Sequence, residues 1–384
     1  MTASRARQFL SGNKAACLAV GFSALLAIVL VGQPVLAQSS VLRGQLRDLP
    51  EQAEEAYGFR EGSFIVAPIP FQNPTLGTGL TLGAGYLFKA DEGSNTSTLG
   101  FGGLKTSNGS KAYALGANVS LSNNKWRFLA LAGKADINYD LFLGDAEIPV
   151  QQDGEFYRLG VFYGVAPNLS FGVAGQALNT TLKLDGAGGL PDGLIPNPGL
   201  STYQLDLVAD WDRRNDNIYP TSGSHLVVTL SQAEARYEGG RDDRFGKAKA
   251  LYDIYFPVGQ ADVIAGRLAA CGAGMDAPFF EKCALGAVDN FRGFPATEYI
   301  GTRLVSAQAE YRGRINKWLG YVAFAGVGAV SGLYDNTLNS SLRVAGGVGT
   351  RIRLSQKQKL DYAIDVAFNN QSDTILYISI GQRF

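Results

Sequence analysis

Beyond residue 61 the chain alternates between apolar and polar positions with a period of two. In 202–212, apolar and aromatic side chains occupy the odd positions, whereas aspartates stand at several even ones. The segments 247–256, 342–354 and 358–369 follow the same rule and carry several charges on their polar faces. Because successive side chains of a β-strand point to opposite faces, this pattern predicts strands with one apolar and one polar face.

About sixteen such segments follow one another up to the C-terminus, separated by turns. They lie at 62–70, 77–89, 97–106, 111–121, 125–137, 154–165, 168–183, 200–212, 223–235, 245–257, 261–274, 301–314, 318–330, 341–354, 358–370 and 374–384. Short turns contrast with long links at 184–200 and 275–300, and aromatic residues gather near strand ends, as they do at membrane interfaces. We therefore predict an all-β fold over 62–384: a transmembrane antiparallel β-barrel of sixteen strands, closed so that no strand edge is left unpaired.

The first 61 residues have a different character. A basic start and an apolar run over 15–31 are followed by Val35-Leu36-Ala37, the pattern of a cleavable signal peptide over 1–37. A retained membrane-anchor helix is the alternative. Residues 38–61 are then a short periplasmic segment, helical over 41–57 or else a disordered tail. This start predicts export to the outer membrane.

Charge and composition argue against several function classes. Without the signal peptide the chain holds 31 basic and 34 acidic residues, so no basic surface for nucleic acid is expected. His225 is the only histidine, and no nucleophile motif accompanies it. We expect no catalytic residues, no metal site, no cofactor and no enzymatic activity.

Two cysteines remain after Cys17 leaves with the signal peptide. Cys271 and Cys283 flank the start of the link at 275–300, in a chain bound for an oxidising compartment. We predict a disulfide that staples a strand end to the following loop. The alternative is two unpaired small core residues.

Arg292 lies in the same link, within the motif Phe291-Arg292-Gly293-Phe294. On the following strand, Glu310 has the parity of the polar face and should point into the lumen. If the loop folds inward, Arg292 can pair with Glu310 through a charge-assisted hydrogen bond. A solvated loop arginine is the alternative.

The next strand is suited to receive such a loop. Phe324, Gly326 and Gly328 share the inward parity. Glycines at these positions leave room for a loop backbone to approach closely.

Several motifs in this order resemble the bacterial surface antigen barrel family. That family includes the outer-membrane assembly factor BamA, its relative TamA and the two-partner secretion transporters. The resemblance covers 62–384 and rests on Phe291-Arg292-Gly293-Phe294, Glu310-Tyr311-Arg312, Phe324-Ala325-Gly326-Val327-Gly328, the terminal Phe384, Pro68-Ile69-Pro70-Phe71, and the turn residues Asp212, Arg214, Asp216, Pro220 and Gly223.

The resemblance implies roles for these residues. Arg292 would lie in the lumen at the tip of the sixth extracellular loop, with Glu310 as its partner. Members often carry an aspartate where Gly326 stands, so the tether is expected to rest on Glu310 alone. Phe384, on the apolar face of the last strand, would be the signal read by the assembly machinery during insertion, although Gln382 departs from the usual apolar residue.

The N-terminal segment and the function follow from the same comparison. Family members carry periplasmic POTRA domains that capture clients, whereas 38–61 alone would precede the barrel, as in a short member. We predict a role in outer-membrane protein or lipid assembly or translocation, with contacts to outer-membrane lipid. A passive or gated solute channel, or a structural barrel that recruits a periplasmic partner through 38–61, are the alternatives. A translocon predicts few hydrogen bonds between 62–70 and 374–384, where Pro68 and Pro70 remove two donors.

Overall fold

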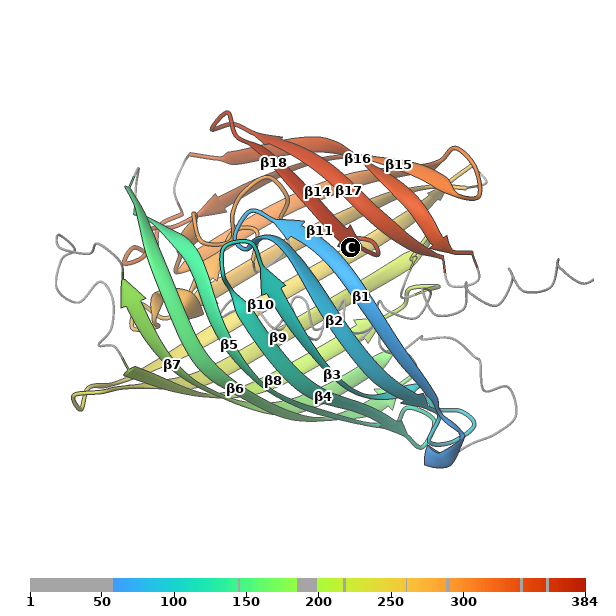
Figure 1. Cartoon of the computed structure of the whole chain (residues 1–384), viewed down its shortest axis with the longest axis horizontal. Coiled ribbons are helices and arrows are strands. Elements are labelled where there is room, and N and C mark those ends of the chain that lie inside the picture. Colours follow the sequence, from blue (N-terminus) through green and yellow to red (C-terminus); the bar gives the residue numbers. More distant parts are fainter. Residues whose placement is uncertain are drawn as a thin grey trace, which may run out of the picture.

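The alternating segments fold as a closed β-barrel (Figure 1). The structure, a computed structural model, describes residues 58–143, 146–184, 199–216, 219–259, 261–287, 291–338, 341–356 and 359–384. Sixteen antiparallel strands follow the order of the chain around the barrel, so that the first strand meets the last. This confirms the predicted fold class and strand number. The predicted signal peptide and the helix at 41–57 lie outside the described residues.

The barrel strands are connected in simple up-and-down order. They are β1 (Ser63–Asn73), β2 (Gly77–Phe88), β3 (Ser97–Thr106), β4 (Lys111–Leu121), β5 (Trp126–Leu143), β6 (Ala146–Ala166), β7 (Leu169–Leu184), β8 (Gly199–Asp212), β9 (Gly223–Tyr237), β10 (Asp242–Val258), β11 (Asp262–Ala273), β14 (Arg303–Arg314), β15 (Leu319–Val330), β16 (Arg343–Ser355), β17 (Leu360–Asn369) and β18 (Thr374–Ile380). The link between β11 and β14 contains the two-stranded sheet of β12 (Cys283–Ala284) and β13 (Ile300–Gly301).

The described helices are two short 3-10 turns, η2 (Phe59–Glu61) and η3 (Phe279–Glu281). Within the described part of the chain, no helix combines the length and apolar character needed to cross a membrane.

The apolar faces of the strands point outward and the polar faces inward. Outward residues such as Phe101 and Leu159 are about two-thirds exposed, whereas the inward Asp206 and Asp253 are almost fully buried. A water-soluble protein shows the reverse arrangement. An apolar outer band around a polar interior is the arrangement of a barrel that spans a membrane.

Strands β5 and β6 extend further than the sequence pattern predicts. They pair over eighteen positions and form the tallest hairpin of the barrel. Ile137, Tyr139 and Leu141 continue the inward face of β5 as apolar residues, and they belong to the same buried cluster as the phenylalanines of the β11–β14 link. The prediction ended this strand at 137, whereas the alternation continues through Tyr139 and Leu141. In this extension the apolar face points inward onto the β11–β14 link, the reverse of the arrangement in the rest of the barrel.

The seam between β1 and β18 is the weakest junction. Among the described residues, one pair joins these strands, Gln72 with Ile378. Other neighbouring strands share at least seven pairs, the fewest being between β17 and β18. Pro68 and Pro70 on β1 lack N–H groups. The seam therefore has the few hydrogen bonds that a translocon would predict.

Candidate functional site: a clamped loop inside the barrel

The link between β11 and β14 folds into the lumen. Leu285, Phe291 and Phe294 of this link are almost completely buried and pack in one cluster with inward residues of the barrel wall. Phe291 and Phe294 also contact each other, with ring centres 6.1 Å apart. The link is therefore an interior element, as the family resemblance implied for Arg292, and its attachments to the wall include three through side chains of the link.

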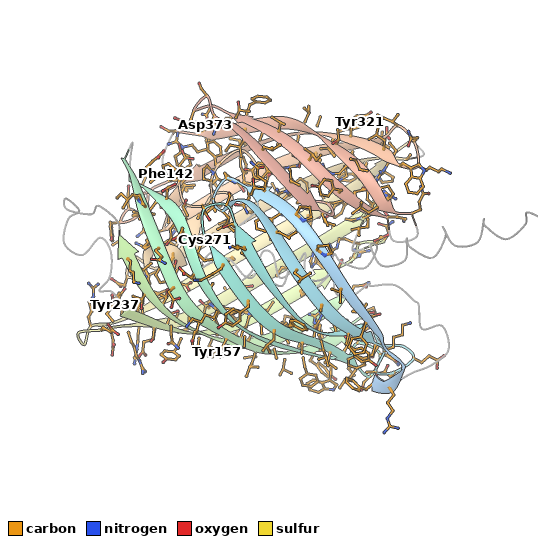
Figure 2. All side chains as sticks on the ribbon, viewed as in Figure 1. Phe142, Tyr157, Tyr237, Cys271, Tyr321 and Asp373 are labelled. Carbon is orange, nitrogen blue, oxygen red and sulfur yellow. A yellow bond between two sulfur atoms is a disulfide. The ribbon has the colours of Figure 1, made fainter. Side chains whose placement is uncertain are left out.

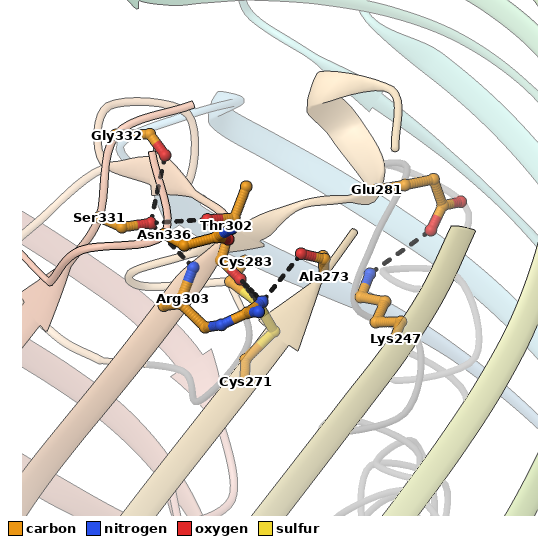
Figure 3. Close-up of a disulfide and its surroundings, with 10 residues drawn as sticks. All are labelled: Lys247, Cys271, Ala273, Glu281, Cys283, Thr302, Arg303, Ser331, Gly332 and Asn336. Atoms are coloured by element: carbon orange, nitrogen blue, oxygen red, sulfur yellow. Dashed lines mark hydrogen bonds and ion pairs between the residues drawn. A yellow bond between two sulfur atoms is a disulfide. The ribbon is translucent and has the colours of Figure 1, made fainter. Parts of the chain in front are cut away.

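The first attachment is the disulfide. Cys271 near the end of β11 is bonded to Cys283 of β12, with a Cα–Cα distance of 5.8 Å (Figure 3). This confirms the predicted pairing. Nearby, Arg303 at the start of β14 donates from Nη1 to the carbonyl oxygens of Ala273 and Thr302, both at 3.0 Å. The two ends of the link are thus fixed to the rim of the wall.

The second attachment is a buried ion pair that the sequence interpretation missed. Lys247 Nζ on β10 lies 3.4 Å from Glu281 Oε2 in η3, and each side chain is about 1% exposed (Figure 3). The alternation of β10 placed Lys247 on the inward face. Glu281 lies in a loop, where alternation makes no prediction. Only the path of the loop brings the two charges together.

The third attachment is the Arg292 guanidinium. Its Nη2 donates to Glu310 Oε2 on β14 at 2.5 Å, and its Nη1 donates to Asp365 Oδ2 on β17 at 2.8 Å. Its carbon Cζ lies 3.6 Å from the ring centre of Phe324 on β15. Arg292 is therefore held by two carboxylates and stacked on an aromatic ring.

Asp365 corrects one expectation. The prediction that the tether rests on Glu310 alone is wrong, because Asp365 provides a second acceptor. Asp365 was assigned to the polar face of its segment, but β17 is three strands away from β14 along the wall. The curvature of the closed barrel brings both carboxylates to one guanidinium, and strand parity carries no information on that distance.

These charges belong to a larger buried network. Glu310 also accepts a hydrogen bond from Arg312 Nε at 2.6 Å, and Asp365 accepts one from Arg351 Nη1 at 2.5 Å. Removing one member of such a network leaves its partners desolvated and unpaired, which typically costs about 3–5 kcal/mol. The arrangement positions the loop inside the barrel.

Glycines at the contact leave the room that the loop needs. A Cβ at Gly326 would lie 2.8 Å from the Phe291 ring, and a Cβ at Gly328 would lie 2.8 Å from Leu285. Gly293 has φ +112°, a conformation that side chains rarely adopt. Its N–H donates to the Tyr377 hydroxyl on β18 at 2.9 Å, so the loop also contacts the last strand.

The C-terminal residues turn into the lumen. Phe384 was expected to continue the outward apolar face of the last strand, and that placement is wrong. β18 ends at Ile380, Gly381 takes φ +87°, and Phe384 is buried against Tyr255. Arg312 Nη2 donates to the backbone oxygen of Phe384. The role of Phe384 as an assembly signal stays a prediction.

Gln382 fits this inward path. Its Nε2 donates to Asp361 Oδ2 at 2.7 Å, and its Oε1 accepts from Arg351 Nε at 3.2 Å. A polar side chain is therefore suited to this position, where the usual apolar residue of the resemblance would meet charges.

The motif between β8 and β9 builds a compact turn. Asp212 accepts two hydrogen bonds from the Arg214 guanidinium, at 2.9 and 2.7 Å, and Asp216 Oδ1 accepts the backbone N–H of Tyr219 at 3.0 Å. Gly223 has φ +95°, and a Cβ there would lie 2.1 Å from a backbone oxygen.

This turn also contacts β14 and β16, which are not its neighbours in the sheet. The carbonyl oxygen of Pro220 accepts a hydrogen bond from Arg312 Nη1 at 3.4 Å. The Tyr219 ring centre lies 5.2 Å from the Arg314 guanidinium and 5.0 Å from that of Arg353. The turn therefore closes over the end of the lumen where the C-terminus lies.

Lys282 in the loop adds a titratable contact. Burial lowers the pKa of its ammonium to about 8. Its Nζ donates to the carbonyl oxygen of Leu333 and lies 4.3 Å from the ring centre of Tyr334. These partners connect the loop to the link between β15 and β16.

Comparisons with known proteins agree with this architecture. Residues 199–384, from β8 to the C-terminus, match the model of the Omp85 superfamily domain. No curated protein sequence is similar enough to count as a match. Among the described residues, no group of histidine, cysteine and acidic side chains is arranged to hold a metal ion.

Solved structures of similar fold are also barrels. BamA from Haemophilus ducreyi lacking POTRA domains 1–3 aligns with a TM-score of 0.57 and 13% identity, over 83% of this chain and 70% of that one. CdiB from Escherichia coli aligns with a TM-score of 0.53 and 12% identity, over 89% of this chain and 69% of that one. CdiB from Acinetobacter baumannii aligns with a TM-score of 0.52 and 12% identity, over 82% of this chain and 59% of that one. Identities this low show a shared fold alone.

Proposed function

Because this chain is a barrel of the Omp85 superfamily, carrying that domain over residues 199–384, we propose that it assembles or translocates proteins or lipids at the outer membrane. The seam between β1 and β18 would open laterally, and the clamped loop would hold the lumen closed while it does. Outer-membrane lipid is the medium into which the seam opens. The assembly machinery would act on this barrel during its own insertion.

The seam is the observation that carries this proposal. One residue pair joins β1 to β18, whereas β5 and β6 share eighteen. Each ladder pair adds backbone hydrogen bonds worth about 1 kcal/mol net. Opening at the seam is therefore far less costly than opening elsewhere in the wall.

The interior supports assembly over free solute passage. Phe291 and Phe294 lie within the lumen, and Arg292 is fixed to both β14 and β17. A passive channel needs a water-filled path, which these contacts obstruct. The loop must leave for such a path to open.

A disulfide across the seam tests the proposal. Gln72 and Ile378 are directly paired, so cysteines at both positions lie within bonding range. Oxidised Gln72→Cys/Ile378→Cys barrels in proteoliposomes should insert an added outer-membrane barrel substrate at least ~10-fold more slowly than reduced ones, equivalent to about 1.4 kcal/mol in the barrier. Protease protection of the substrate measures insertion.

A matched pair elsewhere serves as control. Leu80→Cys/Lys105→Cys joins β2 to β3, which are already well paired. Its oxidation should leave the insertion rate unchanged. Equal insertion by oxidised and reduced seam variants would refute lateral opening.

Planar-bilayer conductance separates this proposal from the channel alternative. The wild-type barrel should show low conductance, and Arg292→Ala should show frequent larger openings as the loop leaves. A large stable pore in the wild type would favour the passive channel.

A further inference from the structure

The outer surface of the barrel carries an apolar cleft over β7. The cleft has a volume of about 760 Å³, within the usual range of ligand sites. Gly175 forms its floor, and a Cβ built there meets no heavy atom within 4 Å. Across the sheet, Gly175 pairs with Leu159 of β6 and Leu205 of β8, which form the two walls.

Two tyrosines frame the same cleft one row closer to the loops. Ala177 continues the floor and pairs with Tyr157 of β6 and Tyr203 of β8. Both tyrosines are almost half exposed on the outer wall, and Tyr157 projects away from the barrel (Figure 2). The absent side chain at Gly175 and the small methyl group at Ala177 therefore leave a gap between large residues.

The position along the strands places the cleft at a membrane interface. On β8 the outward residues are apolar from Trp211 to Tyr203, and the next outward residue is Ser201. Aromatic residues at both ends of an apolar band mark the two interfaces of a membrane barrel. Tyr203 lies at the end that carries the long loops, which is the extracellular one in barrels of this type.

A polar recess continues the cleft beyond the tyrosines. It has a volume of about 250 Å³. The residues of the next cross-strand row line it, Glu155, Asn179, Ser201 and Arg236, together with Lys134. The Arg236 guanidinium lies 5.1 Å from the Tyr203 ring centre, so the recess and the cleft share a border.

We propose that the cleft and the recess together bind one phospholipid of the outer leaflet. An acyl chain lies along β7 between the walls formed by β6 and β8, and the headgroup enters the recess. The order of apolar floor, aromatic frame and polar recess matches the order of chain, ester region and headgroup in a lipid. This site is independent of the proposed function.

The charges around the recess select the headgroup. The cations Lys134, Arg236 and Arg244 stand beside the carboxylates of Asp153, Glu155, Glu234 and Glu238. Glu234 pairs with Arg236 at 2.6 Å and with Arg244 at 3.2 Å. Carboxylates outnumber cations among these described residues, so a headgroup with several phosphates would meet repulsion. A zwitterionic headgroup, with a phosphate toward Arg236 and an ammonium toward the carboxylates, is complementary to both signs.

Native mass spectrometry of the full chain in detergent tests the site. Phosphatidylethanolamine is titrated in, and wild type is compared with Gly175→Leu, whose side chain fills the floor. We expect one retained lipid in the wild type and at least a ~10-fold weaker apparent affinity in Gly175→Leu, which corresponds to about 1.4 kcal/mol. Retention of the lipid by Gly175→Leu with wild-type affinity would overturn the site.

Gly103→Leu is the matched control. Gly103 lies on β3 and pairs with the outward residues Leu82 and Tyr113, and a Cβ there meets only a backbone oxygen at 3.4 Å. This variant should bind like the wild type. If Gly175→Leu does not fold, as judged by heat-dependent gel migration, Ala177→Leu narrows the same floor and is tested in its place.

The headgroup is tested with other lipids. Phosphatidylglycerol and diphosphoryl lipid A should bind at least ~10-fold more weakly than phosphatidylethanolamine, a difference of about 1.4 kcal/mol. Arg236→Gln should weaken the binding of phosphatidylethanolamine, while its stability should equal that of Gly103→Leu. Equal retention of all three lipids would overturn the proposed headgroup selection.

Discussion

Arg292 joins three parts of the molecule through one planar group. Its two terminal nitrogens donate hydrogen bonds to Glu310 and Asp365, while the ring of Phe324 packs on the face of the guanidinium. A lysine ammonium at this position is a single point charge and cannot reproduce this fork. The motif therefore requires arginine for geometry as well as for charge.

Loss of this guanidinium should destabilise the barrel. Arg292→Ala leaves Glu310 and Asp365 buried beside an empty position, and we expect the free energy of unfolding to fall by about 3–5 kcal/mol. The free energy of unfolding of Arg292→Lys should lie between the values of Arg292→Ala and the wild type. Urea unfolding followed by tryptophan fluorescence measures the change.

The exposed Arg60 provides the control. Arg60→Ala should leave the unfolding midpoint unchanged. If Arg292→Ala has the same midpoint as Arg60→Ala, the clamp does not contribute to stability.

Lys282 predicts a pH dependence. Its pKa is about 8 in the folded chain against 10.5 for an exposed lysine, so the folded state binds fewer protons between these values. Stability should therefore rise as the pH increases from about 8 to 10.5. Urea midpoints of wild type and Lys282→Met are compared at steps across this window. A wild-type midpoint that rises no more than that of Lys282→Met would contradict the assignment.

The strands and loops differ in how firmly they are held. The tall β5–β6 hairpin pairs continuously, whereas β1 meets β18 at a single position. The β11–β14 link has no long ladder of its own, and its small β12–β13 sheet has two residue pairs. Its position therefore depends on the disulfide, the buried Lys247–Glu281 pair and Arg292.

Removal of the disulfide should loosen this link. Cys271 and Cys283 are twelve residues apart, and closing a loop of this size restricts the unfolded chain by about 3 kcal/mol. Cys271→Ser/Cys283→Ser should lose stability of this order in urea. Wild type treated with a reductant should lose the same amount, while the double variant should not respond. A reductant effect of equal size on both proteins would point to another cause.

The whole barrel is also braced across its mouth. Strand β9 lies three strands from β14 and β8 lies six strands from β16, yet their turn places Tyr219 beside both Arg314 and Arg353. Both arginines bind Asp361 on β17, which also accepts Gln382 of the C-terminal segment. The turn, strands β14, β16 and β17 and the chain end thus meet in one cluster.

Tyr219→Leu tests this brace. It keeps apolar bulk but removes the aromatic face from two guanidinium groups, and we expect a loss of about 1–3 kcal/mol in stability. Tyr334→Leu replaces a mostly exposed tyrosine at the other end and should cost less. The two variants are compared by urea unfolding, and a smaller loss for Tyr219→Leu would argue against the brace.

Much of the architecture could be predicted because alternation is a local property. Each strand shows its inward face through residue parity, which placed Glu310 in the lumen and identified Phe324, Gly326 and Gly328 as facing the loop. The resemblance of the motif sequence added the expectation that Arg292 enters the lumen. The cysteine spacing, together with the predicted export, was sufficient to predict the disulfide.

The remaining features arise from distances between walls, which parity does not contain. Asp365 reaches Arg292 because closure of sixteen strands sets the width of the lumen. Glu281 meets Lys247 because the loop path crosses that width, and Phe384 turns inward at Gly381. The alternation along the chain therefore specified which residues face the interior, whereas the closed barrel decided which of them meet. For Arg292, the closure of the barrel determines that Glu310 and Asp365 are its partners.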